Sequence, residues 1–189
     1  MTSLNESEKH YLLRLARQTL DLYFSERTVL KIAENDVPER LKAKQGAFVT
    51  LTQAGDRLRG CVGLLEPIKP LYQAVIDNAL AAAFFDDRFL PLDKSEWPLV
   101  KIEISVLSAP VEMAISSPAE RLRQLRPLAD GVILKAGNKV ATYLPQVWEE
   151  LKKPEEFLSS LCQKGGWSGD CWKNPEVKIY TYQAEVFEE

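Results

Sequence analysis

The chain has 189 residues, a length that suits one large domain or one domain with a small appended lobe. Apolar residues make up 46% of it, enough for a sizeable core, yet no apolar run is long enough to cross a bilayer, which argues against a membrane protein. With a net charge of −3 the chain has no general attraction to phosphate backbones, so nucleic-acid binding would need a local basic patch.

The start of the chain predicts a cytoplasmic location, and this location bears on the state of the three cysteines. Residues 1–8 have neither the basic start nor the apolar stretch of an export signal, so we expect a cytoplasmic protein. Cys61, Cys162 and Cys171 are odd in number and widely spaced, which fits neither a disulfide framework nor a paired zinc site. In a reducing compartment we expect all three to be free thiols.

Periodicity predicts helices and antiparallel hairpins in alternation. The first helix, over residues 5–24, begins with Asn5 and Glu8 at the spacing of a capping box. The other predicted elements are an irregular connection (33–45), a hairpin (46–53 and 57–65), a helix from Pro70 to residues 86–87, a strand (100–106), a hairpin (131–135 and 139–144), helices that start at Pro145 and Pro154, and a closing strand (177–187). This order argues for an α+β fold with a mainly antiparallel sheet flanked by helices.

The segment Leu-Arg-Gly-Cys-Val-Gly at residues 58–63 is the first candidate for a site. Strict alternation along a strand places Arg59, Cys61 and Gly63 on one face. The core face then receives Leu58, Gly60, Val62 and Leu64. A guanidinium near a thiol favours the thiolate, so we expect Arg59 to lower the pKa of Cys61.

The two glycines of this segment strengthen the interpretation. Gly60 and Gly63 are unfavourable within a strand unless a bulge, a bend or the close approach of another group requires them. Their position around Cys61 therefore suggests a site. The alternative is structural, with Cys61 as a small buried hydrophobe and Arg59 as an ion-pair partner.

Acidic and aromatic residues elsewhere could complete such a site. Asp87 or Glu103 could orient an arginine or take up a proton. The cluster that contains Asp87 and Arg88 could instead be a loop ion pair that holds residues 88–98 in place. Tyr143 joins a hairpin strand to a helix start, where a phenol and backbone N–H groups can meet an anion, although structural packing is the favoured role for Tyr143.

Several kinds of chemistry lack support. His10 is the only histidine and lies on the first helix, which argues against a Cys–His dyad, a multi-histidine metal centre and a Ser–His–Asp triad. No phosphate-binding loop or GxGxxG motif appears, so we expect no nucleotide cofactor. Carboxylates alone could bind a divalent metal, but no recognisable spacing supports such a site.

One basic segment could contact nucleic acid. Arg121, Arg123 and Arg126 are interleaved with Leu122 and Leu125, which predicts a short amphipathic helix with a solvated basic face.

Taken together, several segments resemble the AMMECR family, the protein A component of the AmmeMemoRadiSam system. They are residues 46–51, 58–63, 87–89 with 91–92, 103–107 and 141–148, and the likeness continues through 157–166 to the closing strand. The hexamer at 58–63 is the most specific of them, with Val62 in place of the more usual isoleucine. The resemblance implies one AMMECR-type domain over residues 1–189 with two unequal subdomains, the smaller around 110–170, and a cleft near the hexamer.

The resemblance also implies an association, by gene neighbourhood or fusion, with a Memo-type protein and a radical S-adenosylmethionine enzyme. It implies no defined reaction. The leading hypothesis is a modification pathway in which Arg59 binds an anionic group and Cys61 acts as nucleophile or substrate tether. A competing hypothesis is a non-catalytic adaptor that docks a peptide or a partner subunit, and a third and weaker one is RNA binding through residues 121–126.

Overall fold

The computed structural model describes residues 3–114 and 117–189. The chain divides into two compact units, one that runs to Leu107 and includes Glu185–Glu189, and one over Ser108–Ala184. Each unit is built on a four-stranded sheet, with strand orders β2-β1-β3-β8 and β4-β7-β5-β6. Antiparallel pairing and helices packed on the sheets confirm the predicted α+β fold.

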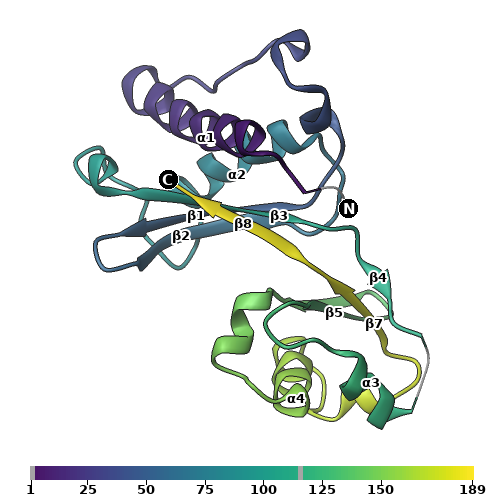
Figure 1. Ribbon diagram of the computed structural model, residues 1–189. Coiled ribbons are helices and arrows are strands. Elements are labelled where there is room, and N and C mark those ends of the chain that lie inside the picture. The colour runs from purple at the N-terminus through teal and green to yellow at the C-terminus, as the bar shows by residue number, and fades with distance from the viewer. Residues whose placement is uncertain (1–2, 115–116) are drawn as a thin grey trace. The chain divides into compact units, whose positions relative to one another are not determined.

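The first unit packs two helices on one face of its sheet (Figure 1). Its elements are α1 (Glu6–Glu26), β1 (Ala47–Gln53), β2 (Arg57–Leu64), α2 (Leu71–Phe84), β3 (Lys101–Leu107) and β8 (Ala184–Glu188). The core between helices and sheet takes Val49 from β1, Ile104 from β3 and Leu12 from α1, none of which is exposed. The alternate residues of the strands therefore point to the opposite face, which we call the outer face.

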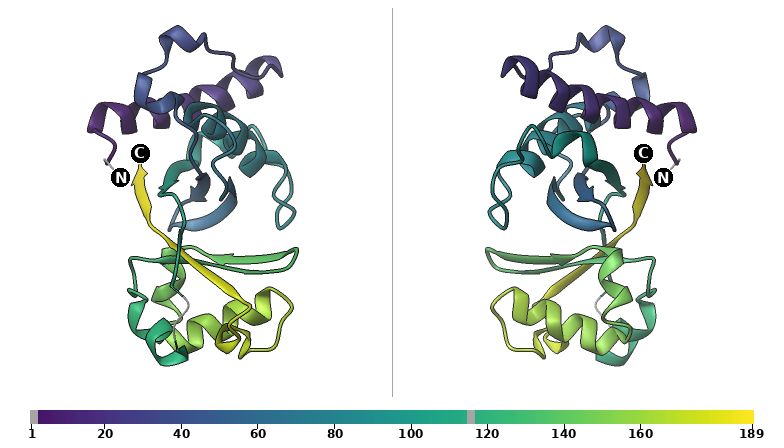
Figure 2. Two further views of the ribbon diagram at one scale, coloured as in Figure 1. Left: turned by 90° about the vertical axis from the view of Figure 1, so that its right-hand side faces the viewer. Right: turned by 90° about the vertical axis from the view of Figure 1, so that its left-hand side faces the viewer.

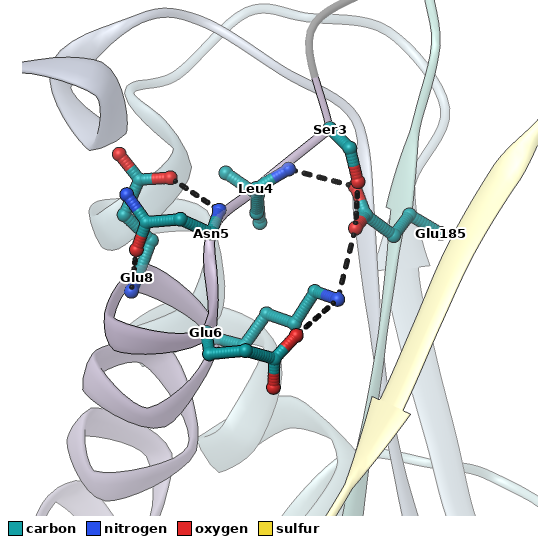
Figure 3. A network of polar contacts seen from close by, with 7 residues as sticks. Ser3, Leu4, Asn5, Glu6, Glu8 and Glu185 are labelled. Atoms are coloured by element: carbon teal, nitrogen blue, oxygen red, sulfur yellow. Dashed lines mark hydrogen bonds and ion pairs between the residues drawn. The ribbon is translucent and has the colours of Figure 1, made fainter.

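The first helix starts as predicted. The Asn5 side chain accepts a hydrogen bond from the Glu8 N–H, and the Glu8 carboxylate accepts one from the Asn5 N–H, both at 2.9 Å. Figure 3 shows this capping box beside Glu185 of β8, whose carboxylate accepts hydrogen bonds from the Ser3 hydroxyl and the Leu4 N–H. These bonds tie the start of α1 to the last strand of the chain.

The second unit also has its longer helix on one face of its sheet (Figure 2). Its elements are β4 (Val111–Glu112), α3 (Pro118–Gln124), β5 (Gly131–Ala136), β6 (Lys139–Tyr143), α4 (Pro154–Lys164) and β7 (Lys178–Tyr182). Phe157 and Leu161 of α4 pack with Val132 of β5 in a separate core. The predicted helix at Pro145 is a short 3₁₀ helix, Pro145–Glu149.

The closing strand predicted over 177–187 is wrong as a single element. The segment forms β7 and β8, which belong to different sheets and meet at Gln183. Its alternation is compatible with one long strand, but β7 pairs with β4 and β5 whereas β8 lies next to β3. The place where the segment divides into two strands is decided by the neighbouring strands with which each half pairs.

The prediction of three free thiols is also wrong. Cys162 of α4 and Cys171 form a disulfide with their Cα atoms 5.8 Å apart, a distance that such a bond accommodates. Cys61 is the free cysteine. The pairing depends on how the segment after α4 folds back on the helix, which spacing alone does not reveal.

The basic face predicted for residues 121–126 is solvated only in part, because Arg123 and Arg126 are exposed but Arg121 is not. Arg121 of α3 is only 4% exposed, and its guanidinium donates to the carbonyl oxygens of Trp172 and Asn174. Arg126 forms an ion pair with buried Asp130 at 2.7 Å. Arg121 is therefore structural, whereas Arg126 keeps a side chain that is 62% exposed.

No helix within residues 3–114 and 117–189 has both the length and the apolar character needed to span a membrane.

Candidate functional site

Strand β2 departs from strict alternation at Arg59. Leu51 pairs with Gly60 and Thr52 pairs with Leu58, so Arg59 is the extra residue of a β-bulge. Leu58 consequently lies on the outer face and is 41% exposed, which corrects the prediction that it is part of the core.

The side chain of Arg59 is held by a carboxylate from the segment after α2. Its Nε and Nη2 both donate to Glu96 at 2.9 Å. The same carboxylate accepts from the Gln53 side chain at 2.8 Å and from the Asp93 N–H at 2.9 Å. We call this group the Glu96 clasp, and it makes Arg59 an ion-pair partner.

A second clasp lies at Cys61. The buried carboxylate of Asp86 accepts from the Cys61 N–H at 2.8 Å and from the Arg88 guanidinium at 2.7 and 2.9 Å. Arg88 in turn donates to the Cys61 carbonyl at 3.3 Å. Because β2 is an edge strand, this Asp86 clasp occupies backbone groups that would otherwise be open to another strand. The Arg88 guanidinium holds the pKa of Asp86 well below its usual range.

The glycines around Cys61 are required by packing. A Cβ at Gly60 would lie 2.0 Å from the carbonyl oxygen of Ala82 in α2, and one at Gly63 would lie 2.3 Å from the ring of Phe48. The sequence predicted that another group comes close to these glycines. That group is α2 at Gly60 and the Phe48 ring at Gly63.

Cys61 shares the outer face with Thr50 and Glu103. Thr50 of β1 pairs with both residues, one on each neighbouring strand, so the three side chains form a row across the sheet, which we call the thiol row. The Thr50 hydroxyl donates to the Cys61 sulfur at 3.3 Å. Glu103 is half-buried, and burial raises its pKa, as does the nearby charge of Glu188.

The thiol of Cys61 is less acidic than the sequence suggests. Burial raises its pKa, and the charges of Asp86 and Glu103 act in the same direction, against the Thr50 hydrogen bond and the charge of Arg88. The expected lowering by Arg59 is wrong, because the bulge and the Glu96 clasp engage that guanidinium elsewhere. At neutral pH the thiol is protonated and can act as a hydrogen-bond donor or a tether.

The remaining predicted site residues have different positions. Asp87 is exposed next to the Asp86 clasp. Tyr143 belongs to the second unit, where its hydroxyl is 3.0 Å from that of Ser160 and its ring packs against Phe157. Within the parts of the chain that the structure describes, no three His, Cys, Asp or Glu side chains gather as metal ligands would.

Sequence reasoning missed the two carboxylates that form the clasps. Asp86 lies beside Asp87 at the end of the predicted helix, but Asp86 rather than Asp87 is the carboxylate that binds Arg88 and the Cys61 N–H. Glu96 had no sequence signal, because it lies 37 residues from Arg59 in the chain.

The Glu96 clasp predicts a pH dependence of stability. Arg59 lowers the pKa of Glu96 to about 2 from the ordinary 4.5. The pKa of Glu96 is lower in the folded state than in the unfolded chain, so the ionised carboxylate stabilises the fold. This stabilisation is complete above pH 4.5 and is lost as the pH falls toward 2. We expect Glu96→Gln to lower the free energy of unfolding at pH 7 by roughly 1 kcal/mol and to flatten its decline in acid, as measured by urea titration.

Asp87→Asn is the matched control, because it removes an exposed carboxylate from the same segment. If both variants keep the acid decline of the original protein, the Glu96 clasp does not contribute to stability.

Comparisons with known proteins agree with this fold. A sequence model of the AMMECR1 family matches residues 13–187. Protein MK0488 of Methanopyrus kandleri is 40% identical over 193 residues, which cover 98% of this chain and 90% of that protein. Protein NEQ441 of Nanoarchaeum equitans is 40% identical over 156 residues, 82% of this chain and 87% of that protein.

A solved structure is similar over nearly the whole length. The crystal structure of the uncharacterized protein PH0010 from Pyrococcus horikoshii matches with a TM-score of 0.90 and 36% identity, covering 98% of this chain and 93% of that one. On the family match, the relatives and this structural similarity, the chain belongs to the AMMECR1 family.

Proposed function

We propose that this protein acts in a modification pathway with a Memo-type protein and a radical S-adenosylmethionine enzyme, and that the thiol row is its working surface. The pathway rests on the family resemblance. The surface rests on one observation: Cys61 is held at its N–H by Asp86, at its carbonyl by Arg88 and at its sulfur by Thr50, while the side chain stays partly exposed. A thiol fixed in this way is suited to present its sulfur in one direction.

In this proposal Cys61 is the nucleophile or substrate tether. Both arginines are paired with a carboxylate, but Arg88 is the better placed cation for an anionic group, because its side chain is 52% exposed whereas that of Arg59 is 12% exposed. Arg59, Gly60 and Gly63 support the site by fixing the strand. Glu103 is the carboxylate at the far end of the thiol row and could take up a proton.

The adaptor alternative is favoured by the raised pKa of Cys61. A protonated thiol is a poor nucleophile, so the catalytic version requires that a bound substrate or partner lower this pKa. The adaptor version has no such requirement, because a surface that docks a peptide or partner subunit needs shape and hydrogen bonds rather than a thiolate.

The state of Cys61 can be measured by alkylation with iodoacetamide as a function of pH. The two other cysteines are in the disulfide, so the reaction reports Cys61 alone. We expect a midpoint above that of a model thiol, because burial disfavours the thiolate. Glu103→Gln should lower the midpoint by removing a negative charge, and Arg88→Gln should raise it by removing a positive one.

Asp56→Asn in the exposed β1–β2 turn is the control, since it changes the net charge by the same amount as Glu103→Gln but away from Cys61. A midpoint at or below that of the model thiol, or equal midpoints in all variants, would contradict the electrostatic account.

The replacement Cys61→Ser separates the two functions. Loss of pathway output with partner binding intact supports chemistry at the thiol, and loss of both supports the adaptor. Unchanged output would exclude a role for Cys61 in either.

RNA binding has less support than the sequence suggests, because Arg121 is buried and Arg126 is paired with Asp130, which leaves Arg123 as the exposed arginine without such an ion pair to a described residue. If RNA binding occurs, it should weaken steeply with salt. A cytoplasmic location and a single AMMECR-type domain over residues 1–189 remain part of our proposal, and both rest on the sequence.

A further inference from the structure

The disulfide closes a glycine-rich loop in the second unit. Cys162 and Cys171 are nine positions apart, and the residues between them include Gly165, Gly166 and Gly169. Gly166 adopts a φ of +74°, which favours glycine. Glycine gives a chain much conformational freedom when nothing constrains it, so the covalent bond is an effective restraint on this loop.

The closed loop forms one wall of a cavity of about 570 Å³. The loop contributes Trp167, Ser168, Asp170 and Cys171 to its lining. Cys171 therefore borders the cavity, and it is 9% exposed, whereas Cys162 is completely buried. Of the two cysteines, Cys171 is the one that lines this cavity.

The shape of this wall depends on the closed loop. The Trp167 N–H donates to the carbonyl of Cys162 at 3.0 Å, and the Trp167 ring lies so close to Gly165 that a Cβ there would be 2.0 Å from it. The ring that lines the cavity is thus held by the residues beside the disulfide.

We propose that the disulfide is a site of thiol–disulfide exchange, in which a reductant thiol enters this cavity and attacks the sulfur of Cys171, and that its reduction releases the loop that forms the cavity wall. The reductant belongs to the glutathione type or to the protein dithiols. This site is separate from the thiol row and does not depend on its function.

The exchange balances as follows. The reductant thiolate forms a bond to the Cys171 sulfur, the S–S bond breaks, and the sulfur of Cys162 leaves as a thiolate that takes a proton from water. A second thiol of the reductant then attacks the reductant sulfur of the mixed disulfide and releases Cys171 as a thiol. The protein disulfide gains two electrons, and the two reductant thiols become a disulfide.

Accessibility is tested first, in a Cys61→Ser background so that each variant has one thiol. Cys162→Ser leaves Cys171, and Cys171→Ser leaves Cys162, as a matched pair. Each folded variant is incubated with glutathione disulfide, and the addition of one glutathione is followed by mass spectrometry. We expect Cys171 to react at least about tenfold faster than Cys162; equal rates, or a faster Cys162, would overturn the proposed direction of attack.

Release of the loop is tested on the full chain with its natural cysteines. Reduced glutathione and dithiothreitol, a monothiol and a dithiol, are compared at millimolar concentration without denaturant. Both should open the disulfide, and cleavage by trypsin after Lys164 should become at least about tenfold faster. The double variant Cys162→Ser with Cys171→Ser should show the fast cleavage without any reductant.

The two reductants also distinguish the sources. Opening by both reductants at equal thiol concentration supports a glutathione-type partner, because a monothiol then suffices, whereas opening by dithiothreitol alone supports a protein dithiol. A disulfide that resists both in the folded protein, or a double variant cleaved as slowly as the oxidised protein, would refute the proposal.

Discussion

Replacing Gly60 by alanine should destabilise the first unit by about 3 kcal/mol, at the upper end of what overpacking produces. The added Cβ would lie 2.0 Å from the carbonyl oxygen of Ala82, a backbone atom that can move only if α2 shifts. Since α2 covers β1 and β2 and supplies Val75 and Ala79 to the core, that shift would loosen the whole face of the sheet.

The loss should appear as a lower midpoint in urea and as a fall in melting temperature of roughly 6–12 °C. Gly55→Ala is the control. Gly55 has open space around it but a φ of +76°, so the same methyl group should cost only about 1 kcal/mol through backbone strain. Equal losses at the two positions would show that contact with α2 is not what requires Gly60.

Replacing Asp86 by alanine should cost roughly 3 kcal/mol. The change leaves the Cys61 N–H without its acceptor and removes the partner of the Arg88 guanidinium, and hydrogen bonds to a buried charge are among the stronger ones. It should also reopen the β2 edge, so amide hydrogen exchange at Cys61 should accelerate together with alkylation of its thiol.

Two further variants test whether the loss of stability comes from the hydrogen bonds of Asp86. Asp86→Asn keeps an acceptor for the Cys61 N–H but loses the charge that holds Arg88, so it should recover part of the stability. Asp87→Ala changes the exposed neighbour and should lie within about 0.5 kcal/mol of the original protein. If Asp86→Ala behaves like Asp87→Ala, the clasp does not stabilise the edge.

The two clasps bear on how the hexamer at 58–63 is interpreted. Arg59 binds Glu96 and the Cys61 N–H binds Asp86, so both residues anchor the segment after α2. Gly60 has no side chain, which allows α2 to pack directly against the strand. A loss of activity on mutating Gly60, and to a smaller extent Arg59, would therefore reflect lower stability as well as any direct role in the site. Cys61→Ser is the more informative change, because the backbone groups that the Asp86 clasp uses remain.

Local pattern was sufficient for most of the fold. The capping box at Asn5, the hairpin turn at residues 54–56 and the helix from Pro154 to Lys164 all lie where the sequence predicts them. These elements depend on residues a few positions apart, whose periodicity and turn chemistry can be read directly. The position of Glu103 on the polar face of its strand follows from the same alternation.

The features that only the tertiary structure decided depend on how segments of the chain lie against one another. The bulge at Arg59, the partner of its guanidinium, the Cys162–Cys171 disulfide and the division of residues 177–187 between two sheets each depend on which segment lies alongside. The sequence by itself determined the α+β class, the family and Cys61 as a candidate. The direction in which the pKa of that thiol shifts was decided in three dimensions, because burial and the charges of Asp86, Arg88 and Glu103 act through space rather than along the chain.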